Sequence, residues 1–278
     1  MTDIKRFEKF KSAIFITGKV MPKTPLHVGQ GRSLDPLDCD SPVIRDVLRR
    51  PYIPGSSFRG VLRSGAEMIL RGVAESPEQE NRLACWGVQD REKWCSSNFL
   101  QSLSEEKKRI LQVDRDLFGD YVDHCCLVCR VFGNMEMASK LKVQDLPLGE
   151  CEIPSTRIKD GIRIDRSKGT VADGGKFDYE VVDPVQAFEM ELQIMNPDPE
   201  EVGVVIMALD AMDSGLTGIG GKRGAGLGRV SVNYSVSELT FSELMDGGTA
   251  TAVSEEKIRS FKDSLKSFAE KVLAEGGQ

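Results

Sequence analysis

Residues 52–63 have the sequence Tyr-Ile-Pro-Gly-Ser-Ser-Phe-Arg-Gly-Val-Leu-Arg, which predicts the start of an α-helix. The Pro-Gly pair ends the preceding segment. Ser56 or Ser57 can serve as the N-cap, because a serine hydroxyl accepts a hydrogen bond from a free amide of the first turn. We expect the helix to continue to about Leu70.

Two faces of this predicted helix differ in chemistry. Arg59 and Arg63 are four residues apart, which places them together on one face. The other face would be the buried stripe, formed by Phe58, Leu62 and Ile69.

The segments around this helix alternate between strand and helix patterns. Residues 13–20 are rich in β-branched and aromatic residues, and residues 188–194 alternate apolar with polar side chains, as in a half-buried strand. A helix from Pro199 to about Met212 and a strand at 229–236 follow. A C-terminal amphipathic helix is indicated by apolar residues at three- and four-residue steps, namely Ile258, Phe261, Leu265, Phe268 and Val272. This mixture predicts an α+β fold with helices on a mostly antiparallel sheet.

The charge is unevenly distributed along the chain. The 278 residues carry a formal net charge of −6. Residues 1–72 nevertheless hold thirteen lysines and arginines against seven acidic residues, whereas residues 183–234 hold three against eight. We therefore expect the N-terminal part to face phosphate groups, although the whole chain is acidic. We find no membrane-spanning apolar run and no signal-peptide pattern, and expect a cytoplasmic protein without a membrane partner.

Five of the seven cysteines lie between residues 85 and 129. They favour a metal site over disulfides, because the cytosol keeps thiols reduced. Cys126 and Cys129 have the two-residue gap with which two thiolates reach one zinc ion, and Cys85 and Cys95 are candidates for the second pair. A site with four protein ligands would be structural, since it leaves no open position for a substrate. Two alternatives for one ligand stay open, His124 and Cys125.

Residues 215–228 form a glycine-rich loop that suits anion binding. Glycines let backbone amides approach a phosphate closely, and Lys222 and Arg223 add positive charge. The loop lacks the Gly-Lys-Ser/Thr ending of a P-loop and precedes a strand, where a dinucleotide-binding loop would follow one. We therefore do not expect a nucleotide cofactor. A flexible turn is the alternative to a phosphate-binding loop.

Four carboxylates lie in the loop that begins at His27. Carboxylates beside a phosphate-binding surface can hold a divalent cation or accept a proton from a hydroxyl, although loop aspartates more often serve in turns. The spacing does not choose among the four, which are Asp35, Asp38, Asp40 and Asp46. A paired-histidine ribonuclease mechanism would require the two histidines of the chain, His27 and His124, to converge.

Several motifs occur together in the order typical of one family. They are Thr24-Pro-Leu-His27-Val-Gly29, Asp40-Ser-Pro-Val-Ile-Arg45-Asp46, residues 52–63, Cys129-Arg-Val-Phe-Gly133 (or Leu117-Phe-Gly119), Ile162-Arg163-Ile164-Asp165-Arg166 and the loop Gly220–Gly228. With these motifs the sequence resembles the RAMP-superfamily backbone subunits of type III CRISPR effector complexes, in particular the Csm-like class. The cysteine-rich segment is similar to the zinc-binding insertions of type III-D subunits and is absent from the simplest Csm-like members.

The resemblance implies an α+β fold with a modified RRM (ferredoxin-like) core at residues 1–74 and 131–250. A thumb β-hairpin would lie at about 152–184. Residues 75–130 would be a cysteine-rich zinc-binding insertion. Residues 251–278, which contain the amphipathic helix, have no counterpart in the family that we can align and are a candidate docking segment for another subunit.

The resemblance also implies an RNA-binding surface. Copies of the subunit would stack along a CRISPR RNA, against the 56–70 helix, the glycine-rich loop and the thumb. The implied contacts are His27, Ser56, Ser57, Arg59, Arg63, Arg163, Arg166, Lys222 and Arg223.

The family's RNA-cleaving aspartate directly precedes Ser-Pro-Val-Ile, and that position is Asp40 here. Flipping a nucleotide out of the guide–target duplex can bring the 2′-hydroxyl of its ribose in line with the adjacent phosphate. The resemblance thus implies an endoribonuclease that needs Mg²⁺ or another divalent cation and cleaves target RNA in antiviral defence. Its partners would be other RAMP backbone subunits and the large and small subunits of the complex. The alternative is a non-catalytic, guide-RNA-binding scaffold subunit.

Overall fold

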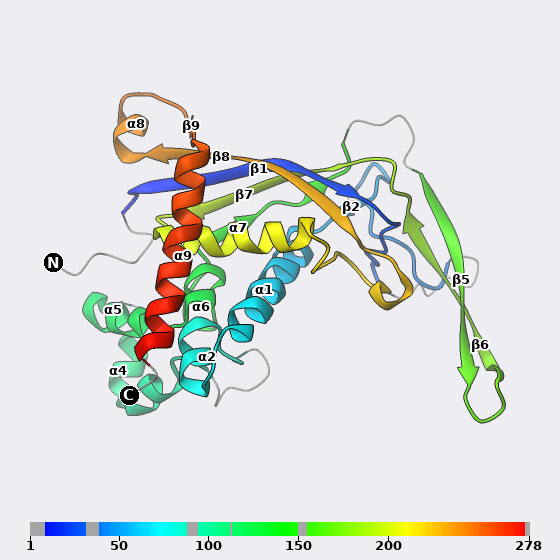
Figure 1. The fold of residues 1–278 in the computed structure, drawn as a ribbon, viewed down its shortest axis with the longest axis horizontal. Coiled ribbons are helices and arrows are strands. Elements are labelled where there is room, and N and C mark those ends of the chain that lie inside the picture. Colours follow the sequence, from blue (N-terminus) through cyan, green and yellow to red (C-terminus); the bar gives the residue numbers. More distant parts are fainter. Residues whose placement is uncertain (1–8, 32–38, 88–93, 112, 150–154, 276–278) are drawn as a thin grey trace.

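The computed structural model describes residues 9–31, 39–87, 94–111, 113–149 and 155–275. At its centre is a five-stranded sheet with the strand order β3-β7-β1-β8-β9, in which every neighbouring pair is antiparallel. The strands are β1 (Ser12–Pro22), β3 (Leu141–Val143), β7 (Phe188–Met195), β8 (Val230–Thr240) and β9 (Thr251–Ala252). The predicted α+β class with an antiparallel sheet is confirmed (Figure 1).

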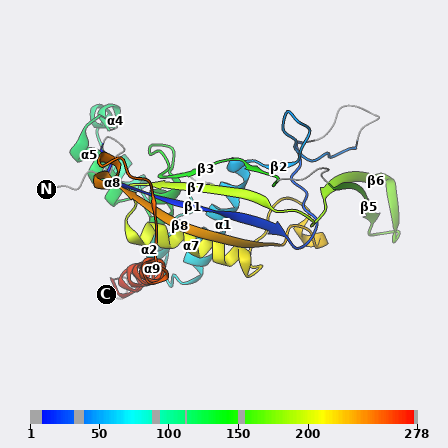
Figure 2. The same ribbon diagram turned by 90° about the horizontal axis from the view of Figure 1, so that it is seen from above.

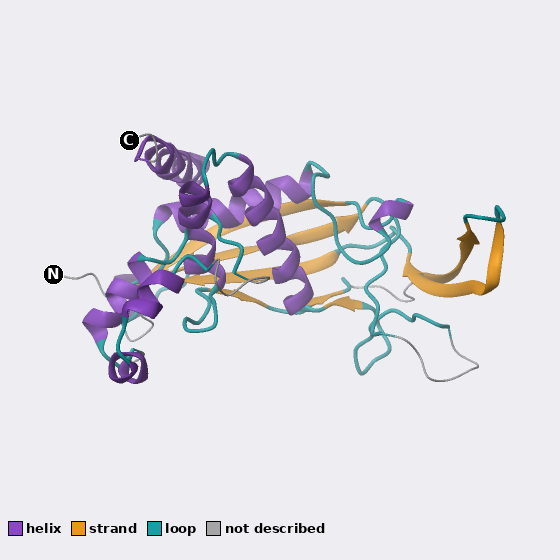
Figure 3. Cartoon of the chain, turned by 90° about the horizontal axis from the view of Figure 1, so that it is seen from below, coloured by secondary structure: helices purple, strands orange, loops and turns teal. Residues whose placement is uncertain are grey.

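In the part of the chain that the structure describes, helices cover one face of this sheet and leave the other face open (Figures 2 and 3). The covering helices are α1 (Gly55–Gly72) and α7 (Pro199–Asp213). The strand β7 explains this arrangement, since Met190, Leu192 and Ile194 are buried while the residues between them are partly or fully exposed. An apolar row on one face of a strand must be covered, and a polar row can stay in water.

The predicted C-terminal amphipathic helix is present as α9 (Glu255–Glu275) and packs on α7. Its buried residues are Phe261, Leu265 and Val272. Among the residues that the structure describes, none of the helices combines the length and the apolar composition that crossing a bilayer requires.

The cysteine-rich segment is helical and shares the core of the sheet. Its helices are α2 (Pro77–Leu83), α3 (Ser97–Ser102), α4 (Glu105–Ile110), α5 (Arg115–Asp123) and α6 (Leu127–Phe132). Leu83, Val128 and Phe132 are buried in the same hydrophobic cluster as the strand residues. The segment is therefore held by apolar packing as well as by its thiols.

A two-stranded hairpin projects from one end of the molecule (Figure 1). It consists of β5 (Thr156–Asp165) and β6 (Thr170–Val182), which pair antiparallel. The hairpin that the resemblance implies at about 152–184 is present over its described part, and residues 150–154 lie outside the described residues. The remaining elements are the short pair β2 (Tyr52–Ile53) and β4 (Leu146–Pro147), the 3₁₀ turn η2 (Arg223–Ala225) and α8 (Phe241–Met245).

The start of α1 differs from the prediction. The helix begins at Gly55 with Pro54 as its N-cap, so the prediction of a serine N-cap was wrong. The backbone amide of Gly55 donates a hydrogen bond to the carboxylate of Asp145, with 2.8 Å between nitrogen and oxygen. A residue distant in the sequence thus satisfies one of the free amides at the start of the helix. Ser56 and Ser57 therefore lie in the first turn, where both are exposed.

The buried stripe of α1 also differs at one position. Phe58 and Leu62 are fully buried as predicted, but Leu70 is buried in place of Ile69, which is half-buried. Steps of four residues from Phe58 reach Leu62, Ala66 and Leu70, and this row faces the core.

Gly203 allows α7 and α9 to approach closely, and this contact gives a stability prediction. A Cβ atom at Gly203 would lie 2.5 Å from the carbonyl oxygen of Phe261 and 2.8 Å from Cβ of Leu265. We expect Gly203→Ala to lower the free energy of unfolding by about 1–3 kcal/mol, because the helices must move apart. Thermal or urea unfolding of the purified chain measures this change.

Gly60→Ala is the matched control, since a Cβ atom at that helical position meets nothing within 4 Å. We expect this control to raise the free energy of unfolding by up to about 1 kcal/mol. Equal stability of the two variants would contradict the close packing of α7 on α9.

Candidate nucleic-acid interface and metal centre

Residues 177–180 of β6 contact two loops that the sequence predicted to be functional, the glycine-rich loop and the loop that carries Asp40. Side chains alternate along a strand, so residues 177 and 179 point to one side and residues 178 and 180 to the other. The Nζ atom of Lys222 lies 4.3 Å from the ring centre of Phe177 and 5.2 Å from that of Tyr179. This cation–π contact seats the glycine-rich loop on β6.

His27 joins the same stretch to the N-terminal loop. Its Nδ1 atom lies 2.7 Å from the carbonyl oxygen of Glu180, and because a carbonyl only accepts, Nδ1 carries the proton. Nε2 is then the acceptor for the hydroxyl of Ser41 at 3.3 Å. The ring also contacts Tyr179 edge-on, with 5.6 Å between the ring centres. His27 is buried, and its ring connects β6 to the loop that carries Asp40.

The glycine-rich loop is held in place by the backbone of His27. The Gly221 amide donates to the carbonyl oxygen of His27 at 2.9 Å. Gly220 has a φ of +83°, and a Cβ atom there would lie 2.4 Å from the same oxygen, so only glycine fits. Lys222 and Arg223 stay exposed beside this fixed segment. The loop is therefore an anchored structure with exposed cations, which favours the phosphate-binding interpretation over a flexible turn.

Asp40 lies in a groove of about 760 Å³ along the hairpin. Its amide donates to the carboxylate of Asp178 at 2.6 Å, and the Asp178 amide donates back to the carboxylate of Asp40 at 3.1 Å. The hydrogen bond from the Asp40 amide, with a further one from Cys39, lowers the pKa of Asp178, so this carboxyl stays ionised. Arg163 and Lys176 line the same groove.

The side chain of Glu180 fixes the loop that carries Asp40. One of its oxygens accepts the Val43 amide proton at 3.1 Å, and the other pairs with the guanidinium of Arg45. Arg45 also donates to the hydroxyl of Thr156 on β5 at 3.1 Å. The loop is thus attached to both strands of the hairpin.

The other predicted loop carboxylates differ from Asp40. Asp46 accepts the amide protons of Leu48 at 2.9 Å and Arg50 at 2.8 Å, and the bond from Arg50 lowers its pKa. Asp46 is therefore a turn residue. Asp35 and Asp38 lie outside the described residues.

The two arginines predicted to contact RNA from α1, Arg59 and Arg63, point toward the cysteine-rich segment. Arg59 donates to the carbonyl oxygen of Phe132. Arg63 donates to the carbonyl oxygen of Gly133 at 3.1 Å and to the sulfur of Cys129 at 3.7 Å. Both line a pocket of about 550 Å³ next to the cysteines. Their predicted contact with RNA stays a prediction, and the structure gives both of them intramolecular partners.

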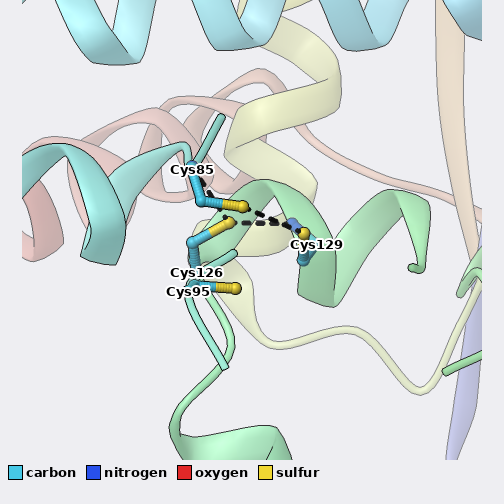
Figure 4. A group of neighbouring side chains, drawn as sticks. All are labelled: Cys85, Cys95, Cys126 and Cys129. Carbon is cyan, nitrogen blue, oxygen red and sulfur yellow. Dashed lines mark hydrogen bonds between the residues drawn. The ribbon is translucent and has the colours of Figure 1, made fainter. Parts of the chain in front are cut away.

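Four cysteines converge where α2 and α6 meet, and their side chains point toward one another (Figure 4). The sulfur atoms of Cys85, Cys95, Cys126 and Cys129 all lie within 4.8 Å of one another. The Cys85 and Cys129 sulfurs are 3.7 Å apart. The amides of Cys85 and Cys129 donate to the sulfur of Cys126 at 3.5 and 3.4 Å.

The two alternative ligands lie outside this cluster. The ring of His124 stacks on Phe99 with 4.6 Å between the ring centres, and its Nδ1 lies 2.7 Å from the carbonyl oxygen of Asp120. The sulfur of Cys125 accepts a hydrogen bond from the side chain of Asn134. Among the described residues, the predicted set of four cysteines is the one group of three or more metal-ligating side chains whose ligand atoms lie together.

The structure brings only some of the predicted RNA contacts together. His27 and Lys222 contact β6, and Arg163, which lies farther along the hairpin, lines the same groove as Asp40. Ser56 and Ser57 lie in the first turn of α1, and Arg166 lies in the turn between β5 and β6.

The part that β6 plays in this site was not predicted from the sequence. Phe177 and Tyr179 support the glycine-rich loop, while Asp178 and Glu180 hold the Asp40 loop. The alternation of aromatic and acidic residues along this stretch is a strand signal that could have revealed it.

Two comparisons relate this chain to known proteins. It is 43% identical over 68 residues to the CRISPR system Cms endoribonuclease Csm3 of Methanothermobacter thermautotrophicus, a match that covers 24% of this chain and 28% of that protein. It is 39% identical over 71 residues to the protein of the same name from Enterococcus italicus, covering 25% of this chain and 32% of that protein. The aligned parts thus span about a third or less of these relatives.

A family model described as the RAMP superfamily matches residues 19–231. The match includes the Asp40 loop, α1, the hairpin and the glycine-rich loop. Because it spans most of the sequence, the chain belongs to the RAMP superfamily.

Proposed function

We propose that this chain is a backbone subunit of a type III CRISPR ribonucleoprotein, which binds CRISPR RNA and cleaves complementary target RNA. The observation that carries the proposal is the place of Asp40. The aspartate of the Asp-Ser-Pro-Val-Ile motif lies in a groove with Arg163 and Lys176, along a projecting hairpin. Membership of the RAMP superfamily and relatives named as endoribonucleases support it.

The topology supports an RRM-like (ferredoxin-like) core. The central elements follow one another as β1-α1-β3-β7-α7-β8, which is the β-α-β-β-α-β succession of ferredoxin-like folds. We propose residues 1–74 and 131–250 as this core, with the β5–β6 hairpin as its thumb. Residues 75–130 are then an insertion, and residues 251–278 carry the added C-terminal helix.

The proposed guide-binding surface combines three features. Ser56 and Ser57 sit at the positive end of the α1 dipole, where hydroxyls and first-turn amides suit a phosphate. Lys222 and Arg223 present cations on the anchored loop. Arg163 and Arg166 extend the positive charge along the hairpin toward a bound duplex.

The proposed chemistry places a carboxylate beside the RNA backbone. Asp40 would either accept the proton of a 2′-hydroxyl or hold a divalent cation, and Arg163 and Lys176 would balance charge that develops on the phosphate. The carboxylates of Asp40 and Asp178 supply the oxygen ligands that Mg²⁺ prefers. A cation bound there would further stabilise negative charge on the phosphate.

The cysteine cluster fits a structural zinc site. With Zn–S bonds of about 2.3 Å, a tetrahedral site separates its sulfurs by roughly 3.8 Å. The 3.7 Å between the sulfurs of Cys85 and Cys129 agrees with this separation. Four protein ligands would fill the coordination sphere, so we assign the zinc a structural part. The zinc-binding insertion also favours the type III-D subtype.

The proposed partners are CRISPR RNA, target RNA, other RAMP backbone subunits and the large and small subunits of the effector complex. A non-catalytic scaffold subunit is the second candidate. It is favoured by the engagement of the Asp40 carboxylate with the Asp178 amide, which is also how a purely structural aspartate would be held.

The first test concerns cleavage by the assembled complex. We expect Asp40→Ala to slow target-RNA cleavage at one or more sites by at least about 100-fold, which is the usual scale of a lost general base. Guide-RNA content should stay unchanged. Asp46→Ala is the control from the same loop, because Asp46 serves a turn. Unchanged cleavage at every site in Asp40→Ala would refute the catalytic role of Asp40 and would favour the non-catalytic scaffold subunit.

The second test concerns guide binding. We expect Lys222→Ala/Arg223→Ala to weaken guide binding and to reduce the slope of log K against log salt by about two, since about one counterion fewer is released per lost contact. Lys266→Ala/Lys271→Ala on α9 removes the same charge from side chains that are 75% and 73% exposed. If both variants change binding equally, the loop is not a guide contact.

The third test concerns the metal. We expect about one zinc ion per purified chain and none in Cys126→Ser/Cys129→Ser, as measured by elemental analysis, because two ligands are lost. The metal-free variant should also unfold at a lower temperature. Cys125→Ser is the control and should keep its zinc, because Cys125 lies outside the cluster. Zinc retained by the double variant would refute the assignment.

A further inference from the structure

A row of charged side chains on α1 faces the cysteine cluster. Arg63, Glu67 and Arg71 follow one another at four-residue steps. The carboxylate of Glu67 accepts from Arg63 at 2.8 Å and from Arg71 at 3.2 Å. Their side chains are only 22%, 14% and 17% exposed, so the row is largely withdrawn from solvent and its geometry is fixed.

The two arginines each hold one half of the cluster. Arg71 donates to the carbonyl oxygens of Ala84 at 2.9 Å and of Cys85, which carries the first ligand. Arg63 donates to the sulfur of Cys129 at 3.7 Å and to the carbonyl oxygen of Gly133 at 3.1 Å. The cysteines come from segments that are 44 residues apart in sequence, and α1 spans both.

Four thiolates around one divalent ion leave a net negative charge in a buried place. Such a charge is costly unless a cation or hydrogen-bond donor compensates it. A guanidinium that donates to a ligand sulfur compensates part of this charge and orients the ligand. Arg63 is in this position, whereas Arg59, one turn earlier on α1, contacts the carbonyl oxygen of Phe132 in the same pocket.

We propose that Arg63 is a positioning residue of the metal centre. Joined to Arg71 through Glu67, it holds the Cys129 half of the site at the correct distance from the Cys85 half. Arg63 therefore serves metal retention rather than direct contact with RNA phosphate. This inference rests on the metal site proposed above and does not depend on RNA cleavage.

The test is a Co²⁺ titration of the purified, metal-free full chain, followed by visible absorption of the thiolate-bound ion and then by displacement with Zn²⁺. We expect Arg63→Gln to weaken metal binding by about 10–100-fold, as is usual for outer ligand partners. Arg63→Lys should fall between Arg63→Gln and the unaltered chain, because it keeps the charge and loses the paired donors. Arg59→Gln is the matched control and should bind Co²⁺ like the unaltered chain.

Two outcomes would overturn the proposal. One is unchanged metal affinity in Arg63→Gln, with its fold verified by circular dichroism. The other is an equal loss in Arg59→Gln. If Arg63→Gln does not fold, Arg63→Lys carries the test, and normal affinity of that variant would refute the need for a paired donor. Failure of the unaltered chain to bind Co²⁺ would instead refute the metal site itself, which is a separate result.

Discussion

The alternation of side chains along residues 177–180 of β6 is the constraint on which the proposed active surface depends. One side of the strand presents two rings to Lys222, and the other presents two carboxylates to the loop of Asp40. The pairing of Tyr179 with Lys159 fixes this register. A slip by one residue would exchange the two sides and would place rings against Asp40. The hairpin therefore sets the geometry of both loops.

Helix α1 links the proposed RNA surface to the cysteine centre. Its first turn carries exposed serines, one face packs Phe58 and Leu62 into the core, and another holds the cysteines through Arg63 and Arg71. If the proposed metal is bound there, its loss would loosen one of the attachments of α1. On this account the insertion is not an independent module, since its apolar residues share the core of the sheet.

Periodicity predicted much of the fold, because burial on one face of an element leaves a local pattern. The alternation in β7 and the three- and four-residue steps in α9 are examples. The errors and omissions came from contacts between distant residues. The carboxylate of Asp145 accepts a hydrogen bond from the first residue of α1, 90 residues away in sequence. The carboxylate of Asp178 accepts one from the amide of Asp40, 138 residues away. Likewise, the pattern of two arginines on α1 predicted a basic face but not its buried partners. The cysteine spacing predicted the four sulfurs that the structure brings together, whereas the place of His124 against Phe99 is a tertiary contact that spacing does not reveal.

The central claim is that guide RNA runs past the first turn of α1, the glycine-rich loop and the groove of Asp40. Ultraviolet crosslinking of a guide RNA that contains 4-thiouridine, in the assembled complex, tests it most directly when the crosslinked peptides are identified by mass spectrometry. The account predicts crosslinks within residues 39–46, 55–60 and 218–226. Crosslinks confined to the open face of the sheet, around Thr17 and Ser235, would contradict it.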